Sequence, residues 1–274
     1  MKYSLLTGAL MLLATNAHAA GPYPKGSIGV FNAGTWYLDT DRSFSWSGTS
    51  PLPADEIHYF GQAGDKPVVY FGRPCFYNEP GAIGITRGNN WYFTTNNLDY
   101  DHADDSNAFV FGTTPFTPTI WNTVPVTFYN GNWLIDWNDN HVQDSGDVVL
   151  GFGSAGQLPV IGLWSTTSGG TRIGTFAPST HTWYVDYDGT NTWSSGDKTW
   201  TFGFSSTDQP VVMPYTDGID RIGIFNAGNW YIDKNNNHVW DGPSGGDEQW
   251  QFGNPGDTPV VTRETTWEGE CPID

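Results

Sequence analysis

Positive charge is scarce in this sequence. Its 274 residues contain 11 lysines and arginines against 29 aspartates and glutamates, which gives a formal charge of −18 at pH 7. Proteins that bind nucleic acid or an anionic membrane surface need clustered lysine and arginine side chains to replace counterions. The sequence therefore predicts no nucleic-acid partner.

Glutamate is also scarce, because 23 of the 29 acidic residues are aspartate and only 6 are glutamate. Glutamate favours helices, whereas aspartate favours turns and metal-binding loops. The chain is in contrast rich in turn formers, with 34 glycines and 18 prolines, and it carries 14 tryptophans, 13 tyrosines and 16 phenylalanines. This composition predicts an all-β protein with many turns, and the aromatic content argues against disorder.

Long hydrophobic runs are absent apart from one short run near the start. Residues 5–14 are apolar, Lys2 precedes them, and an Ala-His-Ala triplet follows at 17–19. The run is too short to span a bilayer as a helix, so we interpret residues 1–19 as a cleaved secretory signal peptide rather than a retained anchor. No later stretch is apolar enough for a transmembrane segment. The mature chain, residues 20–274, is expected to be secreted to the periplasm, the cell surface or the extracellular medium.

Cysteine is nearly absent. The two cysteines, Cys75 and Cys271, lie 196 positions apart, and this spacing matches neither a metal site nor a nucleophile motif. An oxidising compartment permits a disulfide between them, and we expect one in an exported chain.

The sequence repeats one pattern five times. A tryptophan is followed three positions later by aspartate or threonine, then by Phe-Gly, and then by a proline that opens a β-branched pair. Each unit of about 48 residues thus offers four short β segments, which is typical of a propeller blade. The sequence predicts a five-bladed β-propeller in a single domain, with repeat units at about 27–73, 82–121, 124–164, 172–213 and 220–262.

The ends of the chain predict how the ring closes. The first unit lacks its first segment, and a spare first segment stands at the end of the chain, at residues 259–261. We expect this last strand to join the first unit, because an open array would expose unpaired strand edges. Cys75 and Cys271 follow neighbouring inner strands, so their disulfide would staple the closed ring.

Two further sets of ring-bearing residues are interpreted as packing residues. Trp46, Trp193 and Trp240 each fall ten positions after the tryptophan of their unit, and we expect them in the core. His58 stands where other units have an aromatic or leucine two residues before Phe-Gly, so it is interpreted as a packed substitute rather than a catalytic base.

The loop that follows each tryptophan segment carries oxygen-bearing side chains at alternate positions. Ca²⁺ takes about six to eight oxygen ligands, and a tight loop can direct such side chains at one centre. Asx turns give the same pattern without a metal, but its repetition favours calcium. We expect two to four weak sites, because no loop has a glutamate at its twelfth position. The predicted ligands are Asp136, Asn138, Asn140, Asp144 and Asp147 in the third unit, Asp233, Asn235, Asn237 and Asp241 in the fifth (with Asp247 if that loop extends), Asp186, Asp188, Thr190 and Asp197 in the fourth, and Asp39 and Asp41 in the first.

The sixth position of these loops usually needs a glycine, but it is His141 in the third unit and His238 in the fifth. Histidine tolerates a left-handed backbone better than most residues. We therefore interpret both histidines as loop residues rather than metal ligands.

The repeats resemble a known family. The segments IGVFNAGTWYLDTD, IGTFAPSTHTWYVDYDGT and IGIFNAGNWYIDKNNNHVWDG, each followed by FG and then PVV, are similar to repeats of the FG-GAP/VCBS β-propellers of bacterial secreted and surface proteins. The resemblance covers residues 27 to about 262 and implies a calcium-stabilised propeller used in adhesion and ligand recognition. The family commonly has seven blades and an acidic D-x-D-x-D-G loop between the first two strands of a blade. This chain has five units, and its connections at 164–170 and 215–220 lack the full acidic set.

Catalytic motifs are scarce, and one cluster outside the repeat pattern is the candidate. Asp101, His102 and Asp105 in the second unit are interpreted as a metal loop that has lost its pattern, or as a carboxylate site for glycosidic cleavage.

Ligand binding is the alternative to catalysis. Trp137 and Tyr187, at the second position of their loops, and Trp267, outside the repeats, could stack on sugar rings or anchor a protein, or could pack on a neighbouring loop. We expect a secreted, calcium-stabilised propeller that binds an extracellular glycan or protein without catalysis. The alternatives are a carbohydrate-active enzyme, either a glycosidase or a lyase, and a structural subunit of an extracellular assembly.

Overall fold

The computed structural model describes residues 24–50, 54–70, 82–94, 108–121, 124–165 and 170–262. Several predicted features lie outside these residues: the signal peptide, the two cysteines and their disulfide, the Asp101, His102 and Asp105 cluster, and Trp267. Within the described residues the chain is all-β, with one short 3₁₀ turn, η1, at Pro243–Gly245.

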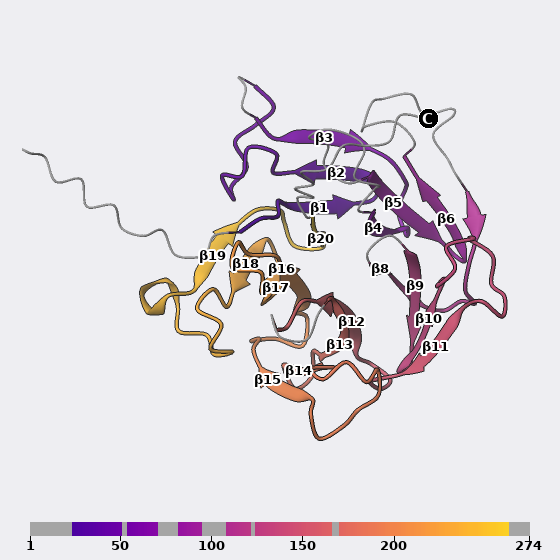
Figure 1. Ribbon diagram of the computed structural model, residues 1–274. Helices are drawn as coiled ribbons and strands as arrows, with labels where there is room; N and C mark the ends of the chain where they lie inside the picture. Colours follow the sequence, from indigo (N-terminus) through magenta and orange to yellow (C-terminus); the bar gives the residue numbers. More distant parts are fainter. Residues whose placement is uncertain are drawn as a thin grey trace, which may run out of the picture.

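The strands form five antiparallel sheets of four strands each, which are the blades of a β-propeller (Figure 1). The predicted fold is therefore confirmed. From the innermost to the outermost strand, blade 1 contains β20 (Thr258–Val261), β1 (Ile28–Asn32), β2 (Thr35–Leu38) and β3 (Glu56–Tyr59). Blade 2 contains β4 (Lys66–Tyr70), β5 (Ala82–Arg87), β6 (Asn90–Phe93) and β7 (Phe109–Val110), and blade 3 contains β8 (Thr117–Trp121), β9 (Val124–Tyr129), β10 (Asn132–Ile135) and β11 (Val148–Gly151). Blade 4 contains β12 (Leu158–Gly162), β13 (Arg172–Ala177), β14 (Thr182–Val185) and β15 (Lys198–Thr201), and blade 5 contains β16 (Gln209–Met213), β17 (Arg221–Asn226), β18 (Asn229–Ile232) and β19 (Glu248–Gln251).

The last strand closes the ring as the sequence predicts. β20 pairs antiparallel with β1, with Ile28 opposite Val261 and Phe31 opposite Thr258. Blade 1 therefore takes its inner strand from the end of the chain and its other three strands from the start (Figure 1). The innermost strands β4, β8, β12, β16 and β20 each contact their neighbours around the axis, so the ring is continuous.

One hydrogen bond explains why tryptophan and Phe-Gly recur together. In every blade the indole N–H of the tryptophan donates to the carbonyl oxygen of the phenylalanine in Phe-Gly, at 2.8 to 3.0 Å. The five indoles are completely buried, so an unpaired N–H there would be costly. The glycine that follows adopts a positive φ, for example 105° at Gly61, which other residues rarely adopt. The residues concerned are Trp36, Trp91, Trp133, Trp183 and Trp230.

The meander topology gives the ring two different faces. The connections from first to second strand and from third to fourth strand lie at one face, which we call the loop face. The tight turns from second to third strand and the turns that join one blade to the next lie at the other face, which we call the turn face. On the turn face, aspartates close the turns between blades. Asp208 accepts the N–H groups of Phe204 and Ser205, at 2.6 and 2.8 Å, and the amide of Asn226 at 2.6 Å.

The prediction that the loop tryptophans lie in the core is wrong for Trp46 and Trp193, whereas Trp240 packs against a core cluster. Trp46 is 44% exposed and Trp193 is 53% exposed, and Trp240 is half-buried. Each lies between two blades: Trp46 contacts Tyr37 of its own blade and Phe252 of blade 5, with ring centroids 5.6 and 6.0 Å apart. A tryptophan at this ten-residue spacing packs between two blades, because its loop folds back over the preceding blade. His58 is half-buried and pairs with Glu56 at 2.9 Å, in keeping with a packed residue.

Candidate cation-binding loops

Four loops on the loop face share one architecture. They follow β2, β10, β14 and β18, and each begins with a fully buried aspartate: Asp39, Asp136, Asp186 and Asp233. Both oxygens of each carboxylate accept backbone N–H groups from three to five residues further along the loop. In the blade 5 loop, for example, Asp233 accepts the N–H groups of Asn237 at 3.1 Å and His238 at 2.9 Å. The first aspartate therefore fixes the course of the loop.

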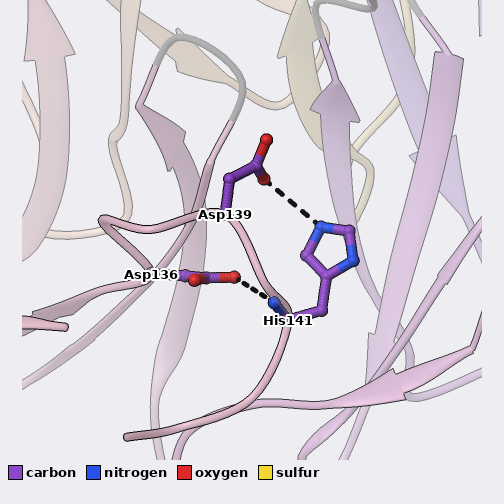
Figure 2. A group of neighbouring side chains, drawn as sticks. All are labelled: Asp136, Asp139 and His141. Carbon is purple, nitrogen blue, oxygen red and sulfur yellow. Dashed lines mark hydrogen bonds and ion pairs between the residues drawn. The ribbon is translucent and has the colours of Figure 1, made fainter. Parts of the chain in front are cut away.

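The sixth residue of each loop has a left-handed backbone, as the sequence predicts for His141 and His238. The φ angles are 56° at Phe44, 61° at His141, 59° at Asn191 and 64° at His238. Figure 2 shows the blade 3 loop, in which Asp136 accepts the N–H of His141 at 2.9 Å, and the His141 ring lies 3.4 Å from Asp139.

The ring of the sixth residue also joins two blades. His141 stacks on Phe109 of blade 2 with centroids 4.1 Å apart, and His238 stacks on Trp200 of blade 4 at 4.0 Å. Phe44 stacks on Trp250 of blade 5 in the same way, at 4.1 Å. Burial lowers the pKa of His238 to about 4, so this ring is neutral at pH 7.

The predicted ligands at the third, fifth and ninth positions do meet in blades 3 and 5. Asn140 donates its side-chain amide to Asp144 at 2.8 Å, and Asn138 donates to the same carboxylate at 3.2 Å. Asn237 and Asp241 form the equivalent bond in blade 5, at 2.5 Å. In the loops of blades 1 and 4 the ninth residue is a serine, and its hydroxyl bonds to an aspartate at the third position. In blade 1, for example, Ser47 donates to Asp41 at 2.8 Å.

A further aspartate closes every one of these loops; Asp147 and Asp197 are among the predicted ligands, Asp247 is predicted only if its loop extends, and Asp55 is not predicted. We call Asp55, Asp147, Asp197 and Asp247 the closing aspartates. Each accepts the backbone N–H of the ninth loop residue, at 2.6 to 2.9 Å. Asp55 was not predicted as a ligand because its loop is longer than twelve residues. The available signal was its place five residues before the phenylalanine of Phe-Gly, which all four share.

Three of the closing aspartates each have one buried carboxylate oxygen without a hydrogen-bond partner among the described residues. The Oδ1 atoms of Asp55, Asp147 and Asp247 have no hydrogen-bond partner among the described residues. Asp55 is 2% exposed and Asp247 is 4% exposed, so water has little access to either side chain. Buried polar atoms in native proteins are normally paired with protein or with ordered water, and here the equivalent oxygen lacks a protein partner in three repeats.

Three carboxylates converge in two of the loops. One oxygen each from Asp39, Asp41 and Asp55 lies within 4.8 Å of the others, and the same holds for Asp186, Asp188 and Asp197. Asp136, Asp139 and His141 form a third group of this size. Among the predicted ligands, Thr190 instead turns its hydroxyl to the carbonyl of Thr192, at 2.9 Å.

Burial disfavours the charged form of the first aspartate in each loop. It raises the pKa of Asp39 to about 7 and that of Asp233 to about 6, and it also raises the pKa values of Asp136 and Asp186. At the more exposed Asp41, hydrogen bonds from Ser47 and Ser43 lower the pKa. A bound cation would favour the charged form of every one of these groups.

The two predicted aromatic residues that are described differ in exposure. Trp137, directly after Asp136, is 61% exposed. It meets Trp121 edge to face at 6.3 Å, and the Trp121 indole N–H donates to Thr171 at 3.0 Å. Tyr187 is half-buried against the blade 4 core, and the Lys198 ammonium lies 5.5 Å from its ring centroid. Of these two, Trp137 is the more exposed.

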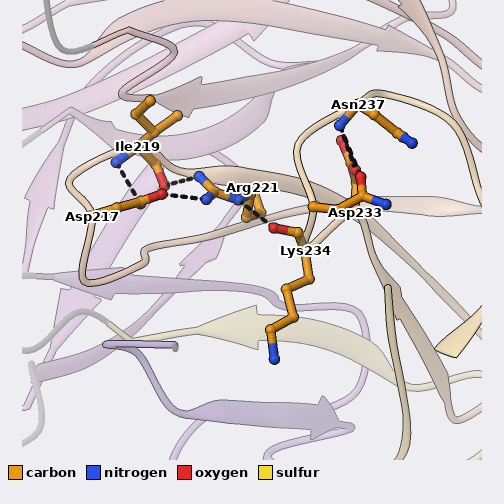
Figure 3. A network of polar contacts seen from close by, with 7 residues as sticks. Asp217, Ile219, Arg221, Asp233, Lys234 and Asn237 are labelled. Carbon is orange, nitrogen blue, oxygen red and sulfur yellow. Dashed lines mark hydrogen bonds and ion pairs between the residues drawn. The ribbon is translucent and has the colours of Figure 1, made fainter. Parts of the chain in front are cut away.

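A second polar cluster, in blade 5, holds the fold together rather than presenting a site (Figure 3). Arg221 is 3% exposed and donates to the carbonyls of Lys234 and Ile219, at 2.9 and 2.7 Å, and to the carboxylate of Asp217. Nearby, Glu248 accepts bonds from Lys234 and from Tyr215, both at 2.6 Å. These contacts tie the two loop-face connections of blade 5 to each other.

Comparison with known proteins adds no family to this description. Family models, curated proteins and solved structures were searched, and none matches the chain. The FG-GAP/VCBS resemblance therefore stays a prediction from the quoted repeats. Among the described residues, no helix has the length and hydropathy that a membrane crossing requires.

Proposed function

We propose that this protein is a secreted, calcium-stabilised β-propeller that recognises an extracellular glycan or protein without catalysis. One observation carries the calcium part of the proposal. The same loop occurs in four blades, and in three of them the closing aspartate keeps a buried carboxylate oxygen without a partner.

The chemistry of the loops favours Ca²⁺ over other common cations. Their candidate ligands are side-chain oxygens of aspartate, asparagine and threonine on irregular loop backbone. Hard oxygen donors in irregular number suit Ca²⁺, whereas Mg²⁺ demands near-ideal octahedral geometry and Zn²⁺ prefers nitrogen and sulfur ligands. Without a bidentate glutamate, affinities of about 0.1 to 1 mM are expected, which extracellular calcium can satisfy.

Trp137 supports the recognition part of the proposal. Its exposed ring is held edge to face by Trp121, and its backbone follows directly from the first aspartate of the blade 3 loop. An exposed indole is suited to stacking on a sugar ring. Calcium in the blade 3 loop would order the backbone that carries this ring.

A glycan array probed with the mature protein in calcium and in chelator tests the recognition part. We expect binding in calcium, at least about tenfold weaker binding in chelator, and loss of binding in Trp137→Ala. Tyr129→Ala is the matched control, because Tyr129 is 48% exposed on the turn face. Binding that is unaffected by Trp137→Ala would contradict this site, and cleavage of a bound glycan would contradict a non-catalytic function.

A further inference from the structure

We infer that Asp39, Asp41 and Asp55 form a calcium site that clamps the seam where the ring closes. The inference rests on the calcium part of the proposed function and assigns it a particular site and consequence. It also adds Asp55, which the calcium-loop pattern of the sequence does not include.

The three carboxylates are already gathered. One oxygen of each lies within 4.8 Å of the others, Asp39 is fully buried and Asp55 is 2% exposed. The Oδ2 of Asp55 accepts the Ser47 N–H at 2.6 Å, while its Oδ1 has no partner among the described residues. Three carboxylates at this separation repel one another when all are charged, and a divalent cation would remove the repulsion and satisfy the unpaired oxygen.

The other loops each lack one of these features. In blade 4 the carboxylates converge equally well, but Asp197 uses both oxygens, accepting N–H groups from Tyr187 at 2.9 Å and Ser194 at 2.7 Å. In blades 3 and 5 the closing aspartate has an unpaired oxygen, but the third loop position is Asn138 or Asn235, where blades 1 and 4 have an aspartate. Among the described residues, the blade 1 loop alone combines three converging carboxylates with an unpaired buried oxygen.

The same loop crosses from the start of the chain to its end. The two oxygens of Asp39 accept the N–H groups of Ser43 and Phe44, each at 3.0 Å. The residues that follow lie along β19 of blade 5: Phe44 stacks on Trp250, and Ser45 forms a bridge with Gln251. A cation at Asp39 would therefore hold the segment that joins blade 1 to blade 5.

This contact supplements the pairing of β20 with β1 and further contacts between the start and the end of the chain, such as the Asn32 to Asp257 hydrogen bond at 2.6 Å and the packing of Trp46 on Phe252. Opening the ring requires all of these contacts to separate, so a cation that stabilises one of them disfavours opening. Calcium at this site would thus act on the seam, whereas calcium in blade 3 would act between blades that are consecutive in the chain.

Calcium titration calorimetry of the mature protein and of Asp55→Asn tests the site. Asparagine keeps an oxygen for the Ser47 N–H but removes the charge, so we expect one fewer calcium ion bound per chain. In chelator the variant should be at least as stable as the wild type, because a buried repulsive charge is gone, and in calcium it should be less stable. A residue with a merely structural role would not reverse the order of stabilities.

Asp208→Asn is the matched control. Asp208 is also 2% exposed and also accepts backbone N–H groups, but it lies on the turn face. This variant should keep the full calcium stoichiometry even if its stability falls equally in both conditions. If Asp55→Asn fails to fold, Asp41→Asn at the half-exposed position of the same site replaces it, with the same expected loss of one calcium ion.

Hydrogen exchange tests the clamp itself. Calcium should slow amide exchange in β1, β19 and β20 of the wild type and leave these rates unchanged in Asp55→Asn. A wild-type protein that binds calcium, with a variant that keeps its stoichiometry and protection, would overturn this inference and leave the proposed function standing. A wild-type protein that binds no calcium would overturn both.

Discussion

The aspartates of the two faces differ in what their oxygens contact. On the turn face, Asp257 accepts the N–H of Asn254 at 2.8 Å with one oxygen and the amide of Asn32 at 2.6 Å with the other. On the loop face, Asp247 accepts one N–H, from Asp241 at 2.6 Å, and its second oxygen has no partner among the described residues. Both side chains are almost completely buried.

The difference shows that burial alone does not mark a binding site in this protein. The turn-face aspartates are complete as caps, and removing one would break hydrogen bonds that exist without any ligand. Three of the four closing aspartates on the loop face, Asp55, Asp147 and Asp247, each have one oxygen without a partner among the described residues, and this oxygen is what a cation would use. The two groups should therefore respond to substitution in opposite ways when calcium is varied.

The largest effect is expected for a turn-face cap. Asp208→Ala removes the acceptor of two backbone N–H groups and of the Asn226 amide. We expect a loss of about 2 to 4 kcal/mol in the free energy of unfolding, because buried donors are left unpaired. Urea unfolding should give the same loss in calcium and in chelator, and a loss confined to one condition would break the comparison.

A smaller, conditional effect is expected for a loop-face closing residue. Asp247→Asn keeps the acceptor for the Asp241 N–H and removes the charge of the unpaired oxygen. The free energy of unfolding should fall by about 1 to 2 kcal/mol in 10 mM calcium, where a millimolar site is occupied, and should not fall in chelator. Asp257→Asn, on the turn face, is the control. An equal loss of unfolding free energy in calcium and in chelator would show that Asp247 acts only through its hydrogen bond, as the turn-face aspartates do.

The smallest effect is expected at the contact between blades. His238→Asn keeps a residue that tolerates the left-handed backbone but removes the ring that stacks on Trp200. Loss of this stack should lower the free energy of unfolding by about 1 kcal/mol, as measured by urea unfolding in calcium. An unchanged stability would show that the loops of the loop face do not join the blades.

The fold could be predicted from the sequence because its signals are local and repeated. Trp230 and Phe252 recur at matching places because one buried hydrogen bond joins them, so the pattern itself reports the blade. The spare strand at 259–261 likewise indicated ring closure, which the pairing of β20 with β1 confirms.

The site was less predictable, because a fixed position count cannot follow loops of different length. Asp55 and Asp247 occupy the same place in their blades as Asp147 and Asp197 do in theirs. Their loops are longer, however, so they do not stand at the twelfth loop position. Counting back from Phe-Gly finds all four. The exposure of Trp46 was missed for a related reason: sequence spacing does not reveal that a loop folds back over the preceding blade.

Differential scanning calorimetry of the mature wild-type protein tests most directly whether the loop face binds calcium. Two millimolar sites should each add about 1.4 to 2.7 kcal/mol in 10 mM calcium. The melting temperature should therefore be about 5 °C or more higher in calcium than in chelator, and magnesium at the same concentration should have less effect. The same melting temperature in calcium and in chelator would contradict the account.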